Sequence, residues 1–174
     1  IMKFTRLLLP QRLPMNRKLH PVTLQQAAED SPTLARLAGL ARELGIGTVV
    51  IDPRGRFLTS ERFPGVTLDD RWPDEAVAAL KPDRATAVVT LSHDPKIDDP
   101  ALIAALNAGA GYVAALGSRR SHAARRERLA AAGFSSERID RIEGPAGIDI
   151  GAIGPAEIAL SIAAGMVRSL HDRR

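Results

Sequence analysis

The sequence has no cysteine among its 174 residues and few aromatic residues, which make up 3% of it. Disulfide bonds, thiolate metal ligands and cysteine nucleophiles are therefore excluded from this chain. No apolar run is long enough to cross a bilayer, so we predict no membrane partner and expect a cytoplasmic protein.

Lysine-rich arms are also absent, although the formal net charge is +4. The positive excess comes mostly from arginines that are interspersed with carboxylates. Few aromatic rings are available for bases to stack on, and single-stranded nucleic acid needs such rings as well as a basic groove. We therefore predict no nucleic-acid partner.

The first twenty residues, IMKFTRLLLPQRLPMNRKLH, are basic and contain no acidic residue. They lack the long apolar region and the small-residue cleavage site of a secretory signal. We interpret residues 1–20 as a leader and residues 21–174 as one domain. A chain of this length buries roughly 70% of its unfolded surface, which is enough for one core.

Beyond the leader, apolar β-branched runs alternate with helical patterns. Strands are expected at 21–26, 48–51, 85–91, 112–116 and 147–150. Helices are expected at 31–44, 74–80, 100–107, 121–132 and 155–170. This alternation predicts an α/β fold, a doubly wound, mostly parallel sheet with helices on both faces, which is Rossmann-like. Ligands of such sheets bind beyond the carboxyl ends of the strands.

The turn Gly117-Ser118-Arg119-Arg120 is the most informative of these strand ends. A glycine between a strand and a helix directs free N–H groups at one point, and the helix dipole favours an anion there. The two arginines add fork-shaped donors. The turn predicts a site for a small molecule with a phosphate or another anionic group. The alternative is the basic, solvated first turn of an ordinary crossover helix.

The first two strand ends argue against an ordinary dinucleotide site. Gln26 and Ala28 stand where a dinucleotide fold has Gly-x-Gly, and the acids that follow repel phosphate. We therefore disfavour NAD(P) or FAD binding. Asp52 follows the second strand, where an acid often holds a ribose hydroxyl. The run Asp52-Pro53-Arg54-Gly55 is equally well explained as a plain turn.

The third strand end carries several ionisable groups. His93 and Asp94 are candidates for acid–base or ligand-orienting roles. Asp98 or Asp99 is expected to cap a helix that begins at Pro100. One histidine with scattered acids is a weak metal signal, so we predict no metal site.

The fifth strand end is rich in glycine, between Gly144 and Ala159. Asp149 lies among apolar residues and needs a partner, for which we predict Arg119 or Arg120. Glu157 falls in the first helical turn, where the dipole favours it. Both acids also have a purely structural explanation, as one ion pair and one capping charge.

The run HDPKIDDPAL and the segment GYVAALGSRRSHAARRERLAAAGFSSERIDRIEGPAGIDIGAIGPAEIALSIAA closely resemble the carboxyl-terminal Rossmann-like domain of the XdhC/CoxI family. The resemblance spans roughly residues 21–170. It implies an accessory factor that binds the molybdenum cofactor, assists its sulfuration and delivers it to a hydroxylase such as xanthine dehydrogenase. The implied partners are that hydroxylase and a sulfurase, and the implied ligand is an anionic pterin phosphate.

Two departures limit what the resemblance implies. Many family members have a further amino-terminal domain whose cysteine is thought to handle the cofactor, and this chain has no cysteine. Gln26 and Ala28 replace the usual Gly-x-Gly, and Gly154 stands where threonine is common. A thiol-based role and nucleotide binding at the first turn are therefore not carried over.

Three hypotheses follow. In the first, the protein is a molybdenum-cofactor chaperone and not an enzyme. Its phosphate site is the Gly117–Arg120 turn, Asp149 orients the arginines, and His93 and Asp94 line the other wall. The second is an NAD(P)-dependent oxidoreductase, and the third a ligand-free protein–protein adaptor. The Ala- and Leu-rich faces of 155–170 also suggest a homodimer.

Overall fold

The computed structural model describes residues 22–26, 32–92 and 94–171. Six parallel strands form one sheet in the order β3-β2-β1-β4-β5-β6. The strands are β1 Val22–Gln26, β2 Thr48–Ile51, β3 Thr67–Asp69, β4 Ala87–Leu91, β5 Tyr112–Ala115 and β6 Ile142–Glu143. The prediction of a doubly wound parallel sheet is confirmed. The leader assigned to residues 1–20 lies outside the described residues.

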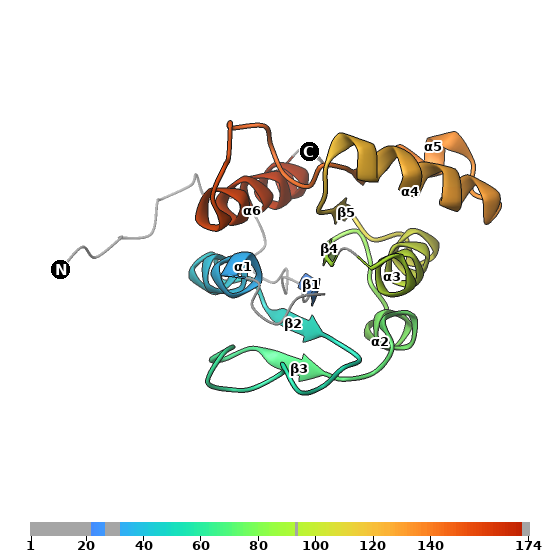
Figure 1. Cartoon of the computed structure of the whole chain (residues 1–174). Helices are drawn as coiled ribbons and strands as arrows, with labels where there is room; N and C mark the ends of the chain where they lie inside the picture. Colours follow the sequence, from blue (N-terminus) through green and yellow to red (C-terminus); the bar gives the residue numbers. More distant parts are fainter. Residues whose placement is uncertain (1–21, 27–31, 93, 172–174) are drawn as a thin grey trace, which may run out of the picture.

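Helices cover both faces of this sheet (Figure 1). The helices are α1 Pro32–Glu43, α2 Pro73–Leu80, α3 Pro95–Ala108, α4 Arg119–Ala131, α5 Ser136–Ile139 and α6 Pro155–His171. Helices α1 and α6 pack side by side on one face, and α2, α3 and α4 lie on the other. The strand order reverses between β1 and β4, the position at which such sheets form a ligand crevice.

The core consists of apolar layers above and below the sheet. On one face, Leu37 of α1 and Ile162 of α6 pack against Val89 of β4. On the other face, Leu102 of α3 packs with Val88 of β4. Neighbouring strand residues thus point to opposite faces, and β4 and β5 are buried throughout, as central strands of a parallel sheet should be.

Two short strands differ from the expected pattern. The sixth strand is Ile142–Glu143 and not 147–150, so that prediction is wrong. The reason is that Ile148 bonds to α6 instead of to the sheet. Its N–H donates to the Ser161 carbonyl at 3.1 Å, and its own carbonyl accepts from Ser161 Oγ at 2.5 Å. Strand β3, at the other edge of the sheet, was not expected either.

Helix α3 begins five residues before the expected start, at Pro95, so that Pro100 lies inside the helix. None of the helices in the described part of the chain has the length and apolar character needed to cross a membrane.

Candidate functional site

The carboxyl ends of β4 and β5 lead directly into the amino-termini of α3 and α4. Both strands are central and fully buried, so they fix the two helix starts side by side on a rigid base. Of the candidate residues, the Gly117–Arg120 turn and Asp94 lie at this edge. His93 lies outside the described residues.

The turn that follows β5 has the geometry of a capped helix start. Ser118 is the N-cap of α4, and its Oγ accepts from the Ser121 N–H at 3.1 Å. Gly117 has φ +137°, a conformation that side chains rarely adopt, and a Cβ there would lie 3.1 Å from Ser121 Cβ. The glycine therefore lets the backbone turn closely over the first turn of α4.

Arg119 and Arg120 are exposed at the start of α4. Neither side chain has a hydrogen bond or an ion pair with a residue that the structure describes. The first N–H groups of a helix have no intrahelical acceptor, and the positive end of the dipole lies there. Two uncommitted guanidinium groups therefore stand beside a helix end that already favours an anion.

A third arginine lies under this turn. Arg125 is only 4% exposed, and its Nη2 donates to the Leu116 carbonyl at 3.1 Å. The same nitrogen lies 3.8 Å from Oδ2 of Asp98, which α3 contributes and which is 2% exposed. Burial raises the pKa of the Asp98 carboxyl to about 7, and Ser92 and Arg125 oppose that rise. Burial also lowers the pKa of Arg125. Sequence reasoning missed this pair, because Arg125 falls within a helix pattern and Asp98 was expected to cap a helix that begins at Pro100.

Asp94 caps α3, which corrects the expectation for Asp98 and Asp99. Its Oδ1 accepts from the Lys96 N–H at 2.9 Å. Asp98 is buried against Arg125, and Asp99 binds Arg128 with two hydrogen bonds of 2.6 and 3.1 Å. The helix begins at Asp94-Pro95 because that pair supplies both a side-chain cap and a proline in the first turn.

Asp52 lies in a turn, which was the alternative to a ribose-binding role. The carboxylate is fully buried and accepts from Arg54 three times, from the backbone N–H, Nε and Nη2 at 3.0, 2.9 and 2.6 Å. Its acceptor positions are therefore largely used by its own turn, and a ribose role stays an untested prediction.

Asp149 does not meet the arginines it was expected to orient. It is exposed, and its Oδ1 accepts from the Gly151 N–H at 3.2 Å. Glu157 is the capping charge of α6, since its Oε2 accepts from the N–H groups of Ile153 and Gly154 at 2.8 and 3.2 Å. These bonds lower the pKa of Glu157. The start of α6 thus carries its own carboxylate, whereas the start of α4 carries free arginines.

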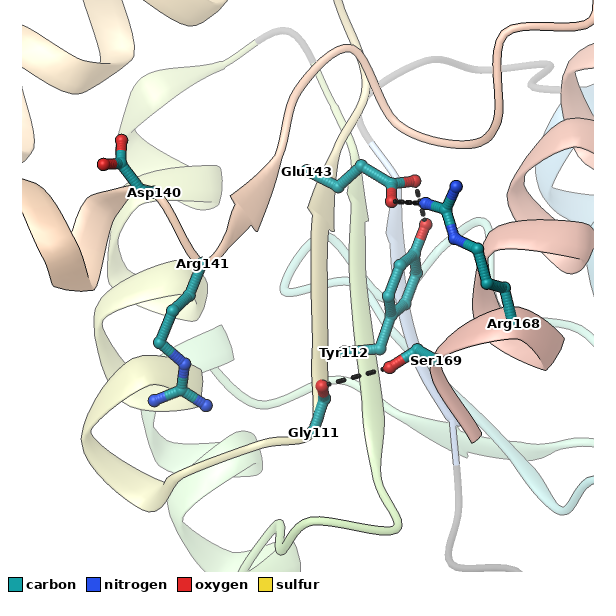
Figure 2. A pocket seen from close by; sticks show the side chains of 7 residues that line it. All are labelled: Gly111, Tyr112, Asp140, Arg141, Glu143, Arg168 and Ser169. Atoms are coloured by element: carbon teal, nitrogen blue, oxygen red, sulfur yellow. Dashed lines mark hydrogen bonds and ion pairs between the residues drawn. The ribbon is translucent and has the colours of Figure 1, made fainter. Parts of the chain in front are cut away.

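The opposite edge of the sheet has an open pocket of about 350 Å³ that sequence reasoning also missed. Figure 2 shows the carboxylate of Glu143 directed at the Tyr112 hydroxyl and the Arg168 guanidinium. Glu143 accepts from Tyr112 Oη at 2.6 Å, from Arg168 Nη2 at 2.7 Å and from the Gly147 N–H at 2.8 Å. Burial and this carboxylate raise the pKa of Tyr112 well above its usual value. These groups bind one another, so we assign them a structural role that joins α6 to the sheet.

The described residues contain no group of three or more His, Asp or Glu side chains arranged to hold a metal ion. At the start of α4, the exposed Arg119 and Arg120 and the first N–H groups of the helix form an arrangement of donors and positive charges. Such an arrangement suits an anionic ligand better than a cation.

Comparison with known proteins places this arrangement in a family. Residues 29–166 match the family model described as the XdhC Rossmann domain. The chain belongs to the XdhC Rossmann-domain family. The resemblance that the GSRR turn and the Gly144–Ala159 segment carry is thereby confirmed.

Two relatives are similar to this member of the XdhC family. It is 39% identical over 95 residues to the molybdenum cofactor insertion chaperone PaoD of Escherichia coli strain K12, a match that covers 55% of this chain and 29% of that protein. It is 28% identical over 139 residues to a probable xanthine dehydrogenase subunit of Bacillus subtilis strain 168, a match that covers 79% of this chain and 40% of that protein.

A solved structure shows the same fold. A crystal structure described as a xanthine dehydrogenase from Bacillus halodurans superposes with a TM-score of 0.71 at 25% identity. The match covers 88% of this chain and 44% of that chain. This XdhC domain therefore spans less than half the length of each relative that it matches.

Proposed function

We propose that this domain is part of an accessory protein for molybdenum enzymes, and that it holds the anionic part of the molybdenum cofactor at the start of α4. The observation that carries the proposal is the pair Arg119 and Arg120, exposed and without a partner in the described part of the chain. The family match and the name of the E. coli relative, a molybdenum cofactor insertion chaperone, supply the ligand class.

The residues of this edge fit the phosphate of the cofactor. Ser118 caps the helix with its own Oγ, so the rest of the first turn is left for a ligand. Arg119 and Arg120 supply two forks that match a phosphate. No thiol is present to bind molybdenum, because the chain has no cysteine. This chain would therefore hold its cargo through the phosphate and not through the metal.

The proposed partner is a molybdenum hydroxylase of the xanthine dehydrogenase type. It is supported by the names of the relatives from B. subtilis and B. halodurans. A chaperone must release its cargo, and exposed arginines suit that task because solvent screens their attraction for an anion. A sulfurase as second partner, a homodimer and a cytoplasmic location stay predictions of the sequence.

The experiment is a titration of the purified protein with the molybdenum cofactor, for the native chain and for Arg119→Ala/Arg120→Ala. We expect at least ~10-fold weaker binding in the double variant. A charge-assisted hydrogen bond contributes about 1.5–3 kcal/mol, and exposure reduces that contribution. An unchanged affinity would overturn the placement of the site.

The matched control is Arg36→Ala/Arg84→Ala, which removes the same charge from two other exposed positions. Arg36 lies on α1, and Arg84 lies in the loop that precedes β4. This control should bind the cofactor as the native chain does. If both double variants lose affinity equally, the attraction is a matter of net charge alone.

A further inference from the structure

The inner face of α4 is polar where a crossover helix usually packs an apolar stripe against its sheet. His122, Arg125 and Leu129 follow one another at spacings of three and four residues, which places them on one face. Leu129 packs in the core, and Arg125 is as deeply buried as a core residue. A charged group has therefore been taken out of water directly under the Gly117–Arg120 turn.

The hydrogen-bonding capacity of Arg125 is mostly unused. Nη2 donates to the Leu116 carbonyl, but Nε and Nη1 have no acceptor among the residues that the structure describes. The ion pair with Asp98 is long, at 3.8 Å, and Asp98 Oδ1 has no donor in the described part of the chain. Buried polar groups nearly always have partners, so these atoms indicate a further group that binds here.

The guanidinium group that carries the unused donors lies against the proposed anion site. The carbonyl that Nη2 contacts belongs to Leu116, the residue before Gly117. A Cβ on Gly117 would lie 3.9 Å from Nη2, so the guanidinium lies under the turn where the backbone is bare. Thr90 of β4 lies next to this turn, because its carbonyl accepts from the Leu116 N–H at 2.8 Å. Thr90 is fully buried, and its Oγ1 also lacks a partner among the described residues.

We infer that Arg125 is a third arginine of the anion site, an interior anchor for an oxyanion such as phosphate or sulfate, and that Asp98 is the internal counter-charge that the oxyanion displaces. This inference rests on the proposed location of the ligand at the start of α4. It adds two residues to the site and makes anion binding dependent on a proton.

The sign of that dependence follows from the charges around Asp98. The groups that face it are Ser92 at the end of β4, Asp99 on α3, and Arg125 on α4. Its pKa is about 7 without a ligand, and an anion beside Arg125 raises that value further, because a second negative charge disfavours the carboxylate. Anion binding therefore takes up a proton, and the affinity falls as pH rises above about 7.

The first test is a calorimetric titration with sulfate between about pH 6.5 and 8.5, since sulfate does not change its charge in that range. Burial and the neighbouring arginines lower the pKa of His122. For the native chain we expect the association constant to fall roughly 3- to 10-fold across the range. A constant affinity would overturn the inference.

Asp98→Asn assigns that slope to one residue. The amide resembles the protonated acid, so the variant should bind sulfate at pH 8.5 about as tightly as the native chain binds at pH 6.5. The matched control is Asp69→Asn, at the end of β3, whose carboxylate binds Arg71 and is not among the groups that face Asp98. It should keep the native slope. If Asp98→Asn also keeps that slope, Asp98 is not the group that the anion displaces.

Arg125→Lys tests the anchor itself. It keeps a positive charge but loses the fork, so we expect roughly 10-fold weaker sulfate binding. The variant also loses the hydrogen bond to the Leu116 carbonyl, so its thermal unfolding is measured without sulfate to establish that it is folded at the temperature of the titration. Arg128→Lys, in the surface pair with Asp99, should bind as the native chain does. Native affinity in Arg125→Lys would mean that the unused donors hold water only, which would overturn the inference.

The failure of this inference can be told apart from that of the proposed function. If the native chain binds sulfate with the expected slope but does not bind the molybdenum cofactor, the oxyanion site stands and the cargo is wrong. If the cofactor binds through Arg119 and Arg120 while the Arg125 and Asp98 variants behave as the native chain, the function stands and the interior anchor is wrong.

Discussion

At the scale of single residues, the carboxylates of this chain show how local hydrogen bonding decides their roles. Asp52 and Glu157 both bond to backbone N–H groups close to them in sequence, and each completes a turn or a helix start. Asp98 is instead buried opposite Arg125 and also interacts with Ser92 at the end of β4. Residue type and spacing in the sequence do not tell a carboxylate that completes a turn or a helix start from one that is buried opposite an arginine. The direction of each side chain does, and that direction is known only when the positions of the helix starts are known.

Gly147 provides the sharpest stability prediction at this scale. Its φ is +95°, and a Cβ would lie 2.7 Å from the backbone nitrogen of Ile162 in α6. Gly147→Ala should lower the free energy of unfolding by about 2–4 kcal/mol, because backbone strain and a clash with rigid backbone add together. Denaturant unfolding measures this change.

Gly151 is the control that isolates the cost of backbone strain from the cost of the clash. Its φ is +70°, but a Cβ there would meet nothing within 4 Å. Gly151→Ala should therefore cost only about 1–2 kcal/mol. Equal losses for the two variants would show that the contact with α6 does not matter.

At the scale of elements, the alternation of strands and helices was predictable, and the two shortest strands were not. Long apolar runs such as Ala87–Leu91 indicate a buried strand by composition alone. Strand β6 has only two residues, which are too few to show the alternation of apolar and polar residues that indicates a strand. The start of α3 was misplaced because Asp-Pro occurs twice, at Asp94 and at Asp99, and both pairs are valid start signals.

The proposed anion site is visible in the sequence in part. A glycine between a strand and a helix start is a sequence signal, so Gly117, Ser118, Arg119 and Arg120 are predicted from the sequence, and the structure places them together at the start of α4. Arg125 was not found, because it lies two turns into the helix and becomes informative only when its burial is known.

Glu143 and its donors Tyr112, Gly147 and Arg168 form a clamp that joins the sheet to α6, and two variants test it. Tyr112→Phe removes one of three donors to Glu143 and should cost about 0.5–1.5 kcal/mol of unfolding free energy. Glu143→Leu removes the shared acceptor and leaves the buried Tyr112 hydroxyl without its partner, so its cost should be larger, about 2–4 kcal/mol. Denaturant unfolding of both variants tests this order. If Tyr112→Phe costs as much as Glu143→Leu, the carboxylate is not the centre of the clamp.

At the scale of the whole molecule, Asp98 makes stability depend on pH in an unusual direction. Its pKa is raised from 3.8 to about 7 in the folded state, so the folded state binds the proton more tightly than the unfolded state does. Stability from this group is present below about pH 4 and is lost as pH rises towards 7, by up to about 4 kcal/mol. This is the opposite of an acid in a strong salt bridge.

Denaturant unfolding of the native chain and of Asp98→Asn between pH 4 and 8 checks this effect. The difference in unfolding free energy between the two should change in favour of the variant as pH rises. A difference that does not vary with pH would show that Asp98 has an ordinary pKa, and it would also remove the basis for the proton-linked binding of the anion.

The whole domain has one edge that holds helix starts and arginines and another that holds a closed structural clamp. The division follows from the parallel sheet, because all carboxyl ends meet on one side. The molybdenum cofactor that we propose as ligand of the positive edge is supported by the name of the E. coli relative, a molybdenum cofactor insertion chaperone.

The most direct test of this account is a pair of titrations of the native chain at low salt, one with the molybdenum cofactor and one with NADH. We predict binding of the cofactor and none of NADH, because Gln26 and Ala28 replace the glycines that a dinucleotide needs. Binding of NADH alone would contradict the account and favour an oxidoreductase. Binding of neither would contradict it as well and favour a protein–protein adaptor.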